Sequence, residues 1–459
     1  MIENTVWMTY TEYLPVELRQ AEEEGKDIEK YRKRVQDLQL ASGNNSTFED
    51  KEKMAWLLLD EMEKEPVRAD YPYVEPNDLE TIKKLRNGKK MTGSEISDES
   101  IYNSIYGAWL GRCIGCVLGQ PVEGWKRERI TGFLKATDNY PIKRFMSSDV
   151  AEEIKERYQV SDNGENAFCD TVTHWINNIK DMPEDDDTNY TVIGLKILET
   201  YGSSFTSEDV AQMWITSLPM GHVSTSERVA YRNIGNLIEA PRCGWWKNPY
   251  REWIGAQIRA DIFGYVSPGD PETAAAMAWK DGRISHVKNG IYGEMLVAAM
   301  LAAAFTEKDP VRVAEAGLAQ IPDTSRLYAV LSNILKDYRN GMEAEEAIGK
   351  LHAMYDEGDS HDWCHTITNA AVVLISVLYS EMDFQKALSL AVESGFDTDC
   401  NGATVGSLMG LMIGPDGIPE IWKEGLTGVL RTGVSGFHQM TVRELADRTY
   451  RLAIEYKKV

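Results

Sequence analysis

Two acidic clusters in the sequence have the composition of a site for a divalent cation. Asp185, Asp186 and Asp187 run directly into an apolar segment, and Asp397 and Asp399 directly precede a second one. Capping a helix is the ordinary use of such residues, but capping needs only one carboxylate. Two acidic turns from distant parts of the chain can converge to supply the several oxygen ligands that a hard cation requires. We therefore predict a metal-binding site for one or two Mg²⁺ ions, with Mn²⁺ as the alternative ion.

Two glycine repeats indicate the elements that position these clusters. Glycine recurs at every fourth residue in segment 107–119 and again in segment 402–414, which follows the second acidic cluster. Each glycine inside a helix costs about 1 kcal/mol relative to alanine, so a glycine face is expected where two helix backbones approach closely. Both segments are too short to span a membrane. We expect them to form a tightly packed pair of central helices.

The remaining pattern predicts an all-α fold. From residue 97 onward, long segments rich in Ala, Leu, Met and Gly show helical spacing, and few stretches alternate as strands do. Residues 1–95 are strongly charged, with helical patches at 15–24 and 50–64. We predict a helical N-terminal extension at 1–95, followed by a compact multi-helix domain at 96–459.

The composition narrows the range of partners. The formal net charge of −23 places a negative field over most of the surface, which disfavours nucleic acids and membranes. An anionic small ligand would need a divalent cation, a helix N-terminus or an arginine. The first residues lack the pattern of a secretory signal, and six cysteines are too few for a disulfide scaffold. We expect a cytoplasmic protein, and the sequence leaves its oligomeric state open.

Several motifs together resemble the ADP-ribosylglycohydrolase family. The glycine-rich string 105–123 is similar to the family's opening helix, including the glutamate just beyond it, Glu123. The triplet Asp186-Asp187-Thr188 resembles the family's first metal motif, and the string 395–399 resembles its second. These motifs occur in the family's order, and the match covers about residues 97–430. The N-terminal extension lies outside it.

Two further matches concern the ligand. Gly255, in the string 255–260 that ends at Arg259 and Ala260, is similar to a glycine-rich stretch that the family uses near the phosphates of its ligand. His286 matches a recurrent histidine before an Ala-rich helix. The resemblance implies that Arg259 meets the pyrophosphate and that Gly255 and His286 lie near the ligand. An ordinary ion pair for Arg259 and a core position for His286 remain the alternatives.

The resemblance also implies the reaction and its residues. The expected enzyme is a glycosidase, a Mg²⁺-dependent hydrolase that cleaves the N- or O-glycosidic bond at the anomeric carbon of a small-molecule or protein-linked ADP-ribosyl group, or of a related ribosyl group. Glu123 is the candidate base or gate. The catalytic candidates are Glu123, Asp187 and Asp397, and the metal positions are Asp185, Asp186, Asp187, Asp397, Asp399 and Cys400.

Some positions depart from the family pattern. Cys400 stands where the family has a hydroxyl residue after its second aspartate pair, and a thiol is a poor ligand for Mg²⁺. Asp185 stands where the family commonly has threonine, which adds a carboxylate. In the first helix, Cys116 replaces a frequent aspartate, and Trp253 and Ile254 precede Gly255 in place of the usual Gly-Asn. The fold is therefore better defined than the ligand.

Three alternatives stay open. Cys113 and Cys116 could join His361, Cys364 and His365 in a zinc site, although the first two lie in a predicted helix without a zinc-knuckle turn. A catalytically weakened module that binds ADP-ribose or another nucleotide is the second alternative. The third is a hydrolase of a small nucleoside-type glycoside, with the aromatic segments 245–246 and 250–253 as a stacking wall.

Overall fold

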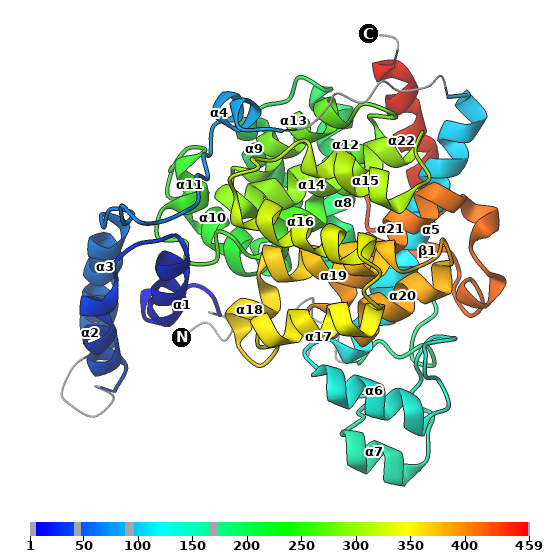
Figure 1. The fold of residues 1–459 in the computed structure, drawn as a ribbon, viewed down its shortest axis with the longest axis horizontal. Coiled ribbons are helices and arrows are strands. Elements are labelled where there is room, and N and C mark those ends of the chain that lie inside the picture. The colour runs from blue at the N-terminus through cyan, green and yellow to red at the C-terminus, as the bar shows by residue number, and fades with distance from the viewer. Residues whose placement is uncertain (1–5, 41–46, 88–95, 165–171, 458–459) are drawn as a thin grey trace.

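A computed structural model describes residues 6–40, 47–87, 96–164 and 172–457. This part of the chain is largely helical, with 22 α-helices and one two-stranded sheet (Figure 1). The predicted all-α fold is therefore confirmed. None of the helices in these ranges is both long and apolar enough to cross a membrane.

The described part of residues 1–95 forms four helices, with α1–α3 lying beside the main body (Figure 1). Their bounds are α1 (Tyr10–Glu23), α2 (Glu29–Leu40), α3 (Phe48–Glu63) and α4 (Leu79–Lys84). The patches predicted at 15–24 and 50–64 correspond to α1 and α3, whereas α2 and α4 were not predicted. Residues 88–95, next to the expected boundary, lie outside the described residues.

The remaining helices build the main body, from which α6 and α7 project (Figure 1). They are α5 (Asp98–Gly119), α6 (Arg127–Ala136), α7 (Glu152–Tyr158), α8 (Asp186–Tyr201), α9 (Ser207–Ser217), α10 (Thr225–Gly235), α11 (Arg242–Trp245), α12 (Asp261–Tyr265), α13 (Pro271–Gly282), α14 (Lys288–Ala304), α15 (Pro310–Leu318), α16 (Arg326–Arg339), α17 (Ala344–Met354), α18 (Ser360–Cys364), α19 (Thr366–Leu378), α20 (Phe384–Glu393), α21 (Thr398–Ile413) and α22 (Val442–Tyr456). The 3₁₀ turns are η1 (Gln120–Val122), η2 (Met220–His222), η3 (Ile254–Arg259), η4 (Pro415–Gly417) and η5 (Glu420–Trp422). Strands β1 (Val429–Arg431) and β2 (Gln439–Thr441) pair antiparallel, with Leu430 opposite Met440.

The central feature of the body is the antiparallel pair of α5 and α21. A Cβ on Gly111 would overlap the carbonyl of Gly406, and a Cβ on Gly115 would overlap that of Gly402. The two backbones therefore touch along their glycine faces, as the repeats predicted. The pairing places the C-terminal end of α5 beside the N-terminal end of α21, where Gly119 lies against Thr398.

Helix α14 completes the core behind this pair. All of its residues except Lys288 are buried, the polar Asn289 and Glu294 among them. A helix without an exposed face must be covered on every side, and α12, α13, α15 and α19 pack around it. The packed helices around α14 thus hold the ends of α5 and α21 in place.

Candidate metal and active site

The two acidic clusters meet because each begins a helix at the same end of the body. Asp185 is the N-cap of α8, and its side chain accepts a hydrogen bond of 2.9 Å from the amide of Asp187. Asp397 is the N-cap of α21 but makes no side-chain capping bond. Capping therefore explains one aspartate of the first cluster and none of the second, so the other carboxylates need another explanation.

Candidate ligand atoms of the two clusters lie close together. Atoms of Asp187, Asp399 and Cys400 are within 4.8 Å of one another, and so are atoms of Glu123, Asp397 and Asp399. A third group of this kind joins Asp187 to Asp185 and to Cys116 of α5. The predicted candidates Asp185, Asp187, Asp397, Asp399, Cys400 and Glu123 thus share one region. Asp186 lines a cavity whose wall also includes Asp185, Asp397 and Asp399.

Buried oxygens without partners show that these residues suit a cation. Both carboxylate oxygens of Asp187 and one oxygen each of Asp397 and Asp399 are buried without a hydrogen-bond partner. Burial and the nearby carboxylates raise the pKa of Asp187 and Asp397 far above the ordinary value, and burial raises that of Asp399 to about 7. Such a cluster of like charges is costly without a cation. Carboxylate oxygens are the donors that Mg²⁺ prefers, so the residues fit this ion.

Supporting residues hold the cluster in position. Arg112 of α5 is fully buried, and it donates hydrogen bonds to the main-chain carbonyls of Asp187 and Ile258 and pairs with Asp261. Gln120 donates a hydrogen bond of 2.8 Å to Asp185. The acidic and glycine patterns do not predict the role of Arg112, although an arginine within an apolar glycine helix is itself a sequence signal.

The residues of the cluster other than Asp187 lie on the wall of a cavity of about 660 Å³. This size is ordinary for a small-molecule site. The cavity also has aromatic and small polar walls. Its described lining consists of Trp7, Val16, Gln120, Pro121, Glu123, Trp125, Gly164, Val172, Thr173, His174, Asp185, Asp186, Ser224, Thr225, Glu227, Tyr250, Trp253, Ile254, Gly255, Ile258, Ser360, Trp363, Cys364, Asp397, Asp399 and Cys400.

Glu123, the candidate base or gate, lies beside the acidic cluster, with Asp397 and Asp399. It follows α5 directly, at the end of η1, and its side chain is exposed at the cavity. The negative charge of Asp399 raises the pKa of Glu123 well above its ordinary value, and the charges of Asp185 and Asp186 act in the same direction. A raised pKa makes a carboxylate a stronger base, which favours proton uptake from water in general acid–base chemistry.

The ligand residues inferred from the family divide into two groups. Gly255 lines the cavity, as expected. Arg259 does not, because its buried guanidinium pairs with Glu227 and Asp281 and lies 3.8 Å from Glu294. These ion pairs engage the guanidinium, so the predicted contact of Arg259 with a phosphate needs a rearrangement that the three carboxylates oppose.

His286 is also a core residue in this structure. Its ring is buried, and its Nδ1 lies 2.8 Å from the hydroxyl of Ser285. Burial and the charge of Arg259 lower the pKa of His286 well below the ordinary value, so the ring is neutral. In this structure His286 therefore lies in the core, which is the alternative to a position near the ligand.

Several lining residues were not predicted. Glu227, in the first turn of α10, is buried beside Gly255, and burial raises its pKa to about 7. Tyr250 and Trp253 of the proposed aromatic wall do line the cavity, but Trp245 lines a different one. The additional aromatic residues come from distant segments, and no local pattern marks them: Trp7, Trp125 and Trp363.

The zinc site considered from the sequence is not assembled among the described residues. Cys116 lies with Asp185 and Asp187, whereas His361 and His365 lie with Glu23. His361 accepts a hydrogen bond from the Trp253 indole at Nδ1, and His365 accepts one from a backbone amide at Nδ1. Because Nδ1 of each ring accepts a hydrogen bond, the ring proton lies on Nε2, the atom that faces Glu23. A metal at these nitrogens would have to displace both protons.

The fold and the site together define an all-α protein with a carboxylate-lined cleft between helix N-termini. The family model of ADP-ribosylglycohydrolase matches residues 97–458, and the chain belongs to this family. It is thus a glycoside hydrolase of the ADP-ribosylglycohydrolase kind. The match begins one residue before α5, so the four N-terminal helices lie outside it.

The chain was also compared with solved structures and with curated proteins. A similar solved chain belongs to an "ADP-ribosylglycohydrolase-related protein complex"; it is 18% identical, covers 78% of this chain and 99% of its own length, and has a TM-score of 0.42. A search of curated proteins returned no match. The assignment to the family therefore rests on the family model.

Proposed function

We propose that this protein is a divalent-cation-dependent hydrolase that cleaves the N- or O-glycosidic bond at the anomeric carbon of an ADP-ribosyl or related ribosyl group. The observation that carries the proposal is the set of buried carboxylate oxygens of Asp187, Asp397 and Asp399 that have no hydrogen-bond partner beside Glu123; one oxygen of Asp187 also lies 3.5 Å from the guanidinium of Arg112. Mg²⁺ is the proposed ion, with Mn²⁺ as the alternative. Asp185 and Asp186 are additional proposed ligands.

The chain's own residues account for the main requirements of the reaction. A bound divalent cation would supply positive charge for the sugar hydroxyls and for water. Glu123 takes a proton from the attacking water, whose oxygen bonds to the anomeric carbon. The bond to the leaving group breaks, its electron pair stays with the leaving atom, and that atom receives the proton. The carboxylates stabilise the positive charge that develops on the sugar.

A ligand-binding module without turnover is the second candidate. The observation that favours it is the thiol of Cys400 within the carboxylate cluster, because burial keeps its pKa far above the ordinary value and a neutral thiol is a poor Mg²⁺ ligand. Turnover distinguishes this candidate from the hydrolase. The cytoplasmic location inferred from the sequence stays a prediction.

The test combines metal dependence with turnover. Chelator-treated protein is assayed for hydrolysis of ADP-ribosylated arginine and serine and of the corresponding ribosyl compounds, with and without added Mg²⁺ or Mn²⁺. We expect activity that returns with the metal and is lost in Asp397→Asn. Asp416→Asn, a change at an exposed aspartate outside the cavity, is the matched control and should retain activity. Metal-independent turnover would refute the proposal, and metal-dependent binding of ADP-ribose without turnover would favour the binding module.

A further inference from the structure

The N-terminal extension, which lies outside the family match, reaches the cavity of the acidic cluster. Trp7, shortly before α1, and Val16 of α1 line this cavity together with Asp397 and Asp399. Both side chains of the extension are only partly buried, so part of their surface remains accessible. The cavity wall is therefore built from two parts of the chain, the family domain and the extension.

Three hydrogen bonds hold the backbone around Trp7. The carbonyls of residues 6, 7 and 8 accept, in this order, hydrogen bonds of 3.4, 2.6 and 3.4 Å from Arg228, Tyr13 and Arg232. Arg228 and Arg232 are one turn apart on α10, and Glu227, in the first turn of this helix, lines the cavity. Segment 6–8 is therefore attached to a helix that begins at the cavity.

Trp7 adopts a backbone conformation that is unfavourable for a bulky residue. Its φ is 60°, in the left-handed region. Such a conformation persists only where the surrounding structure fixes it. Besides the three hydrogen bonds, the guanidinium of Arg228 lies over the indole, 5.0 Å from the ring centre. The indole is therefore held in place before any ligand binds, so contact with a ligand requires little further ordering.

Helix α1 also supports aromatic residues of the family domain. The ring of Tyr13 meets that of Tyr250 edge to face, with 5.8 Å between the ring centres, and Tyr250 meets Trp253 in the same way at 4.8 Å. Tyr250 and Trp253 both line the cavity. Tyr13 thus connects Trp7 with these two residues, and we call Trp7, Tyr250 and Trp253 the aromatic face of the cavity.

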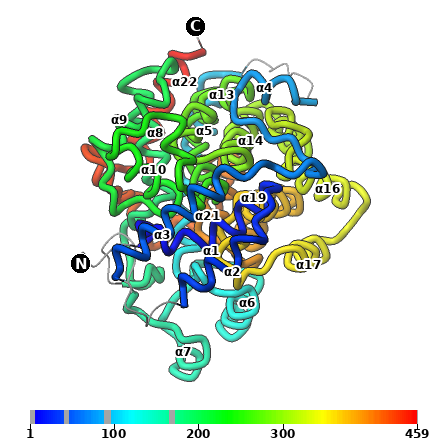
Figure 2. Tube along the Cα trace, turned by 90° about the vertical axis from the view of Figure 1, so that its left-hand side faces the viewer, coloured from blue at the N-terminus to red at the C-terminus, as the bar shows by residue number. Residues whose placement is uncertain are grey.

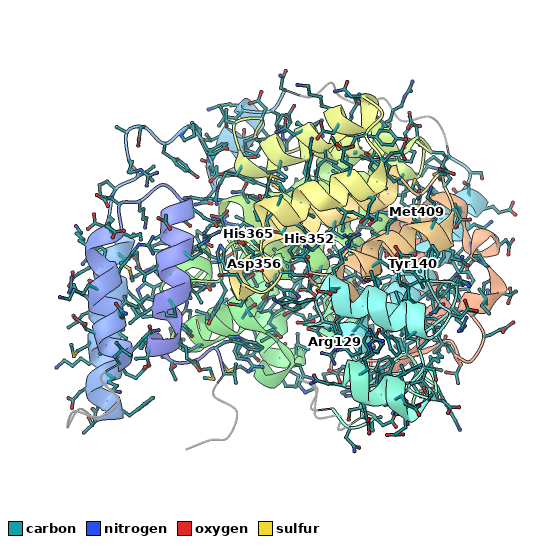
Figure 3. All side chains as sticks on the ribbon, turned by 60° about the horizontal axis from the view of Figure 1, so that its bottom comes forward. Arg129, Tyr140, His352, Asp356, His365 and Met409 are labelled. Carbon is teal, nitrogen blue, oxygen red and sulfur yellow. The ribbon has the colours of Figure 1, made fainter. Side chains whose placement is uncertain are left out.

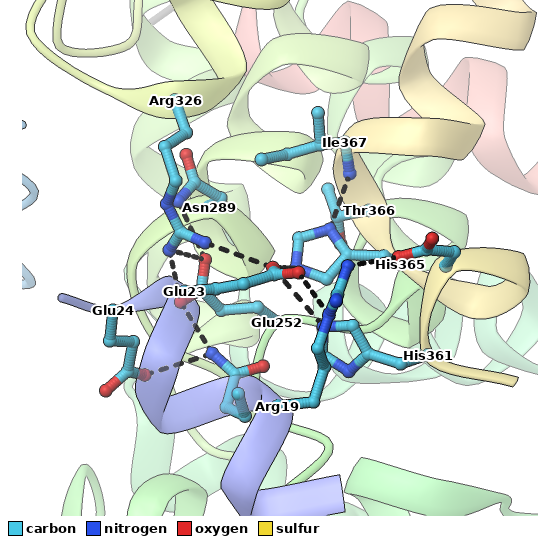
Figure 4. A network of polar contacts seen from close by, with 12 residues as sticks. Arg19, Glu23, Glu24, Glu252, Asn289, Arg326, His361, His365, Thr366 and Ile367 are labelled. Carbon is cyan, nitrogen blue, oxygen red and sulfur yellow. Dashed lines mark hydrogen bonds and ion pairs between the residues drawn. The ribbon is translucent and has the colours of Figure 1, made fainter. Parts of the chain in front are cut away.

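A largely buried polar network fastens α1 to the body (Figure 4). Glu23 faces the Nε2 atoms of His361 and His365 at 3.3 and 3.7 Å, and Arg326 connects Glu23 with Glu252. Figure 3 shows His365 on the side of the body that faces the N-terminal helices, and Figure 2 shows α1–α3 lying against that side. Helix α1 is therefore a docked part of the body.

The same network reaches the aromatic face. His361 accepts a hydrogen bond of 3.1 Å from the indole of Trp253, so α1 supports Trp253 through this histidine. Next to Tyr250 in the sequence, Arg251 forms ion pairs with Glu17 and Glu24 of the extension. These three charged side chains are buried, and removing one partner would leave a buried charge unpaired. The extension is thus attached to the body directly beside the aromatic face.

The aromatic face and the acidic cluster suit different parts of one substrate. The carboxylates, with a bound cation, suit the hydroxyls of a sugar. The flat apolar rings of tryptophan and tyrosine suit another flat ring, which stacks on them without a specific set of hydrogen bonds. A cavity of about 660 Å³ has room for a sugar and for a ring attached to it.

We propose that the N-terminal extension is part of the active site and that Trp7 determines substrate specificity by stacking with a planar ring of the substrate. This inference rests on the proposed hydrolase function, because it names a residue that binds the non-sugar part of that substrate. The ring is either a nucleobase or an aromatic leaving group, and the chemistry of the contact is the same for both. Trp7 acts in binding and not at the reacting bond, so its removal should raise KM and leave kcat nearly unchanged.

Three substrates of the full-length, Mg²⁺-loaded protein test this proposal. ADP-ribosylarginine has an aromatic ring only in its nucleobase, nicotinamide riboside has one only in its leaving group, and ribosylarginine has none. Trp7→Ala should raise KM about tenfold, equivalent to about 1.4 kcal/mol, for one or both of the ring-bearing substrates and should leave that of ribosylarginine unchanged. The substrate affected shows whether the nucleobase or the leaving group stacks on Trp7.

The opposite results are equally clear. Unchanged KM values for all three substrates, or an equal rise for ribosylarginine, would overturn the proposal while leaving the hydrolase function intact. Hydrolysis of ribosylarginine alone by the wild type would have the same meaning. If the wild type hydrolyses none of the three, both the hydrolase function and this inference fail.

Two further variants separate the ring contact from a general effect on the extension. Trp7→Phe keeps an aromatic ring at this position and should restore most of the affinity that Trp7→Ala loses. Phe48→Ala, which removes an exposed aromatic side chain from α3, is the matched control and should leave every KM unchanged. A rise in Trp7→Phe as large as that in Trp7→Ala would overturn the stacking role, and an equal rise in Phe48→Ala would overturn the specific role of Trp7.

Discussion

Substitution by alanine should have opposite effects on stability at Gly111, which lies in the contact between α5 and α21, and at Gly349, which lies outside it. Gly111→Ala places a methyl group against the main chain of Gly406 and Gly410, where no flexible side chain can move aside. Overpacking of this kind costs about 1–3 kcal/mol, and the higher helix propensity of alanine returns about 1 kcal/mol. Gly349→Ala, in α17, meets nothing within 4 Å and should have only the propensity gain. We expect the free energy of unfolding to fall by up to about 2 kcal/mol in Gly111→Ala and to rise by up to about 1 kcal/mol in Gly349→Ala.

Urea unfolding of the two variants and the wild type, monitored by circular dichroism, measures this difference. Because α5 leads to Glu123 and α21 begins beside Asp397, displacement of the pair should also weaken Mg²⁺ binding in Gly111→Ala. The binding in Gly349→Ala should equal that of the wild type. If Gly111→Ala is as stable as Gly349→Ala, the backbone contact does not limit the packing of these helices and the reasoning fails.

Other expected outcomes follow from the same site. Mg²⁺ at about 100 times its Kd should raise the wild-type Tm by about 3 °C, because about 2.7 kcal/mol of stabilisation acts on a large unfolding entropy, and scanning calorimetry of Asp187→Asn should show no such rise. Cys400→Ser should bind Mg²⁺ more tightly in titration calorimetry, because a hydroxyl is a better ligand than a thiol; weaker binding would contradict this. The raised pKa of Asp399 means that the metal-free native state keeps a proton that the unfolded chain releases from about pH 4, so stability is lost as pH rises toward about 7. In the presence of a chelator, the Tm of Asp399→Asn relative to that of the wild type should therefore rise between about pH 5 and about pH 8. A Tm difference that does not change with pH would refute the pKa shift. Arg326→Met should lower Tm strongly, because it leaves the carboxylate of Glu252 buried without its charged partner, and an unchanged Tm would show that the network does not hold the extension.

The sequence by itself determined the helical class, the central glycine pair and the acidic cluster. These features depend on local patterns: helical spacing, glycine at every fourth residue, and aspartates before apolar segments. Because a glycine face is useful only against another backbone, segments 107–119 and 402–414 had to be partners. Their pairing then brings Glu123 and Asp399 together, so much of the candidate site followed from the pattern as well.

Only the tertiary structure decided the surroundings of that cluster. Arg259 has the same local sequence whether it faces a ligand or the core, and only the packing of Asp281 and Glu227 around it shows the latter. Trp7 lies far from the acidic motifs in sequence, and nothing local indicates that it lines their cavity. Local patterns report the periodicity of a segment, whereas the charge and shape of a cleft are set by side chains that arrive from distant segments.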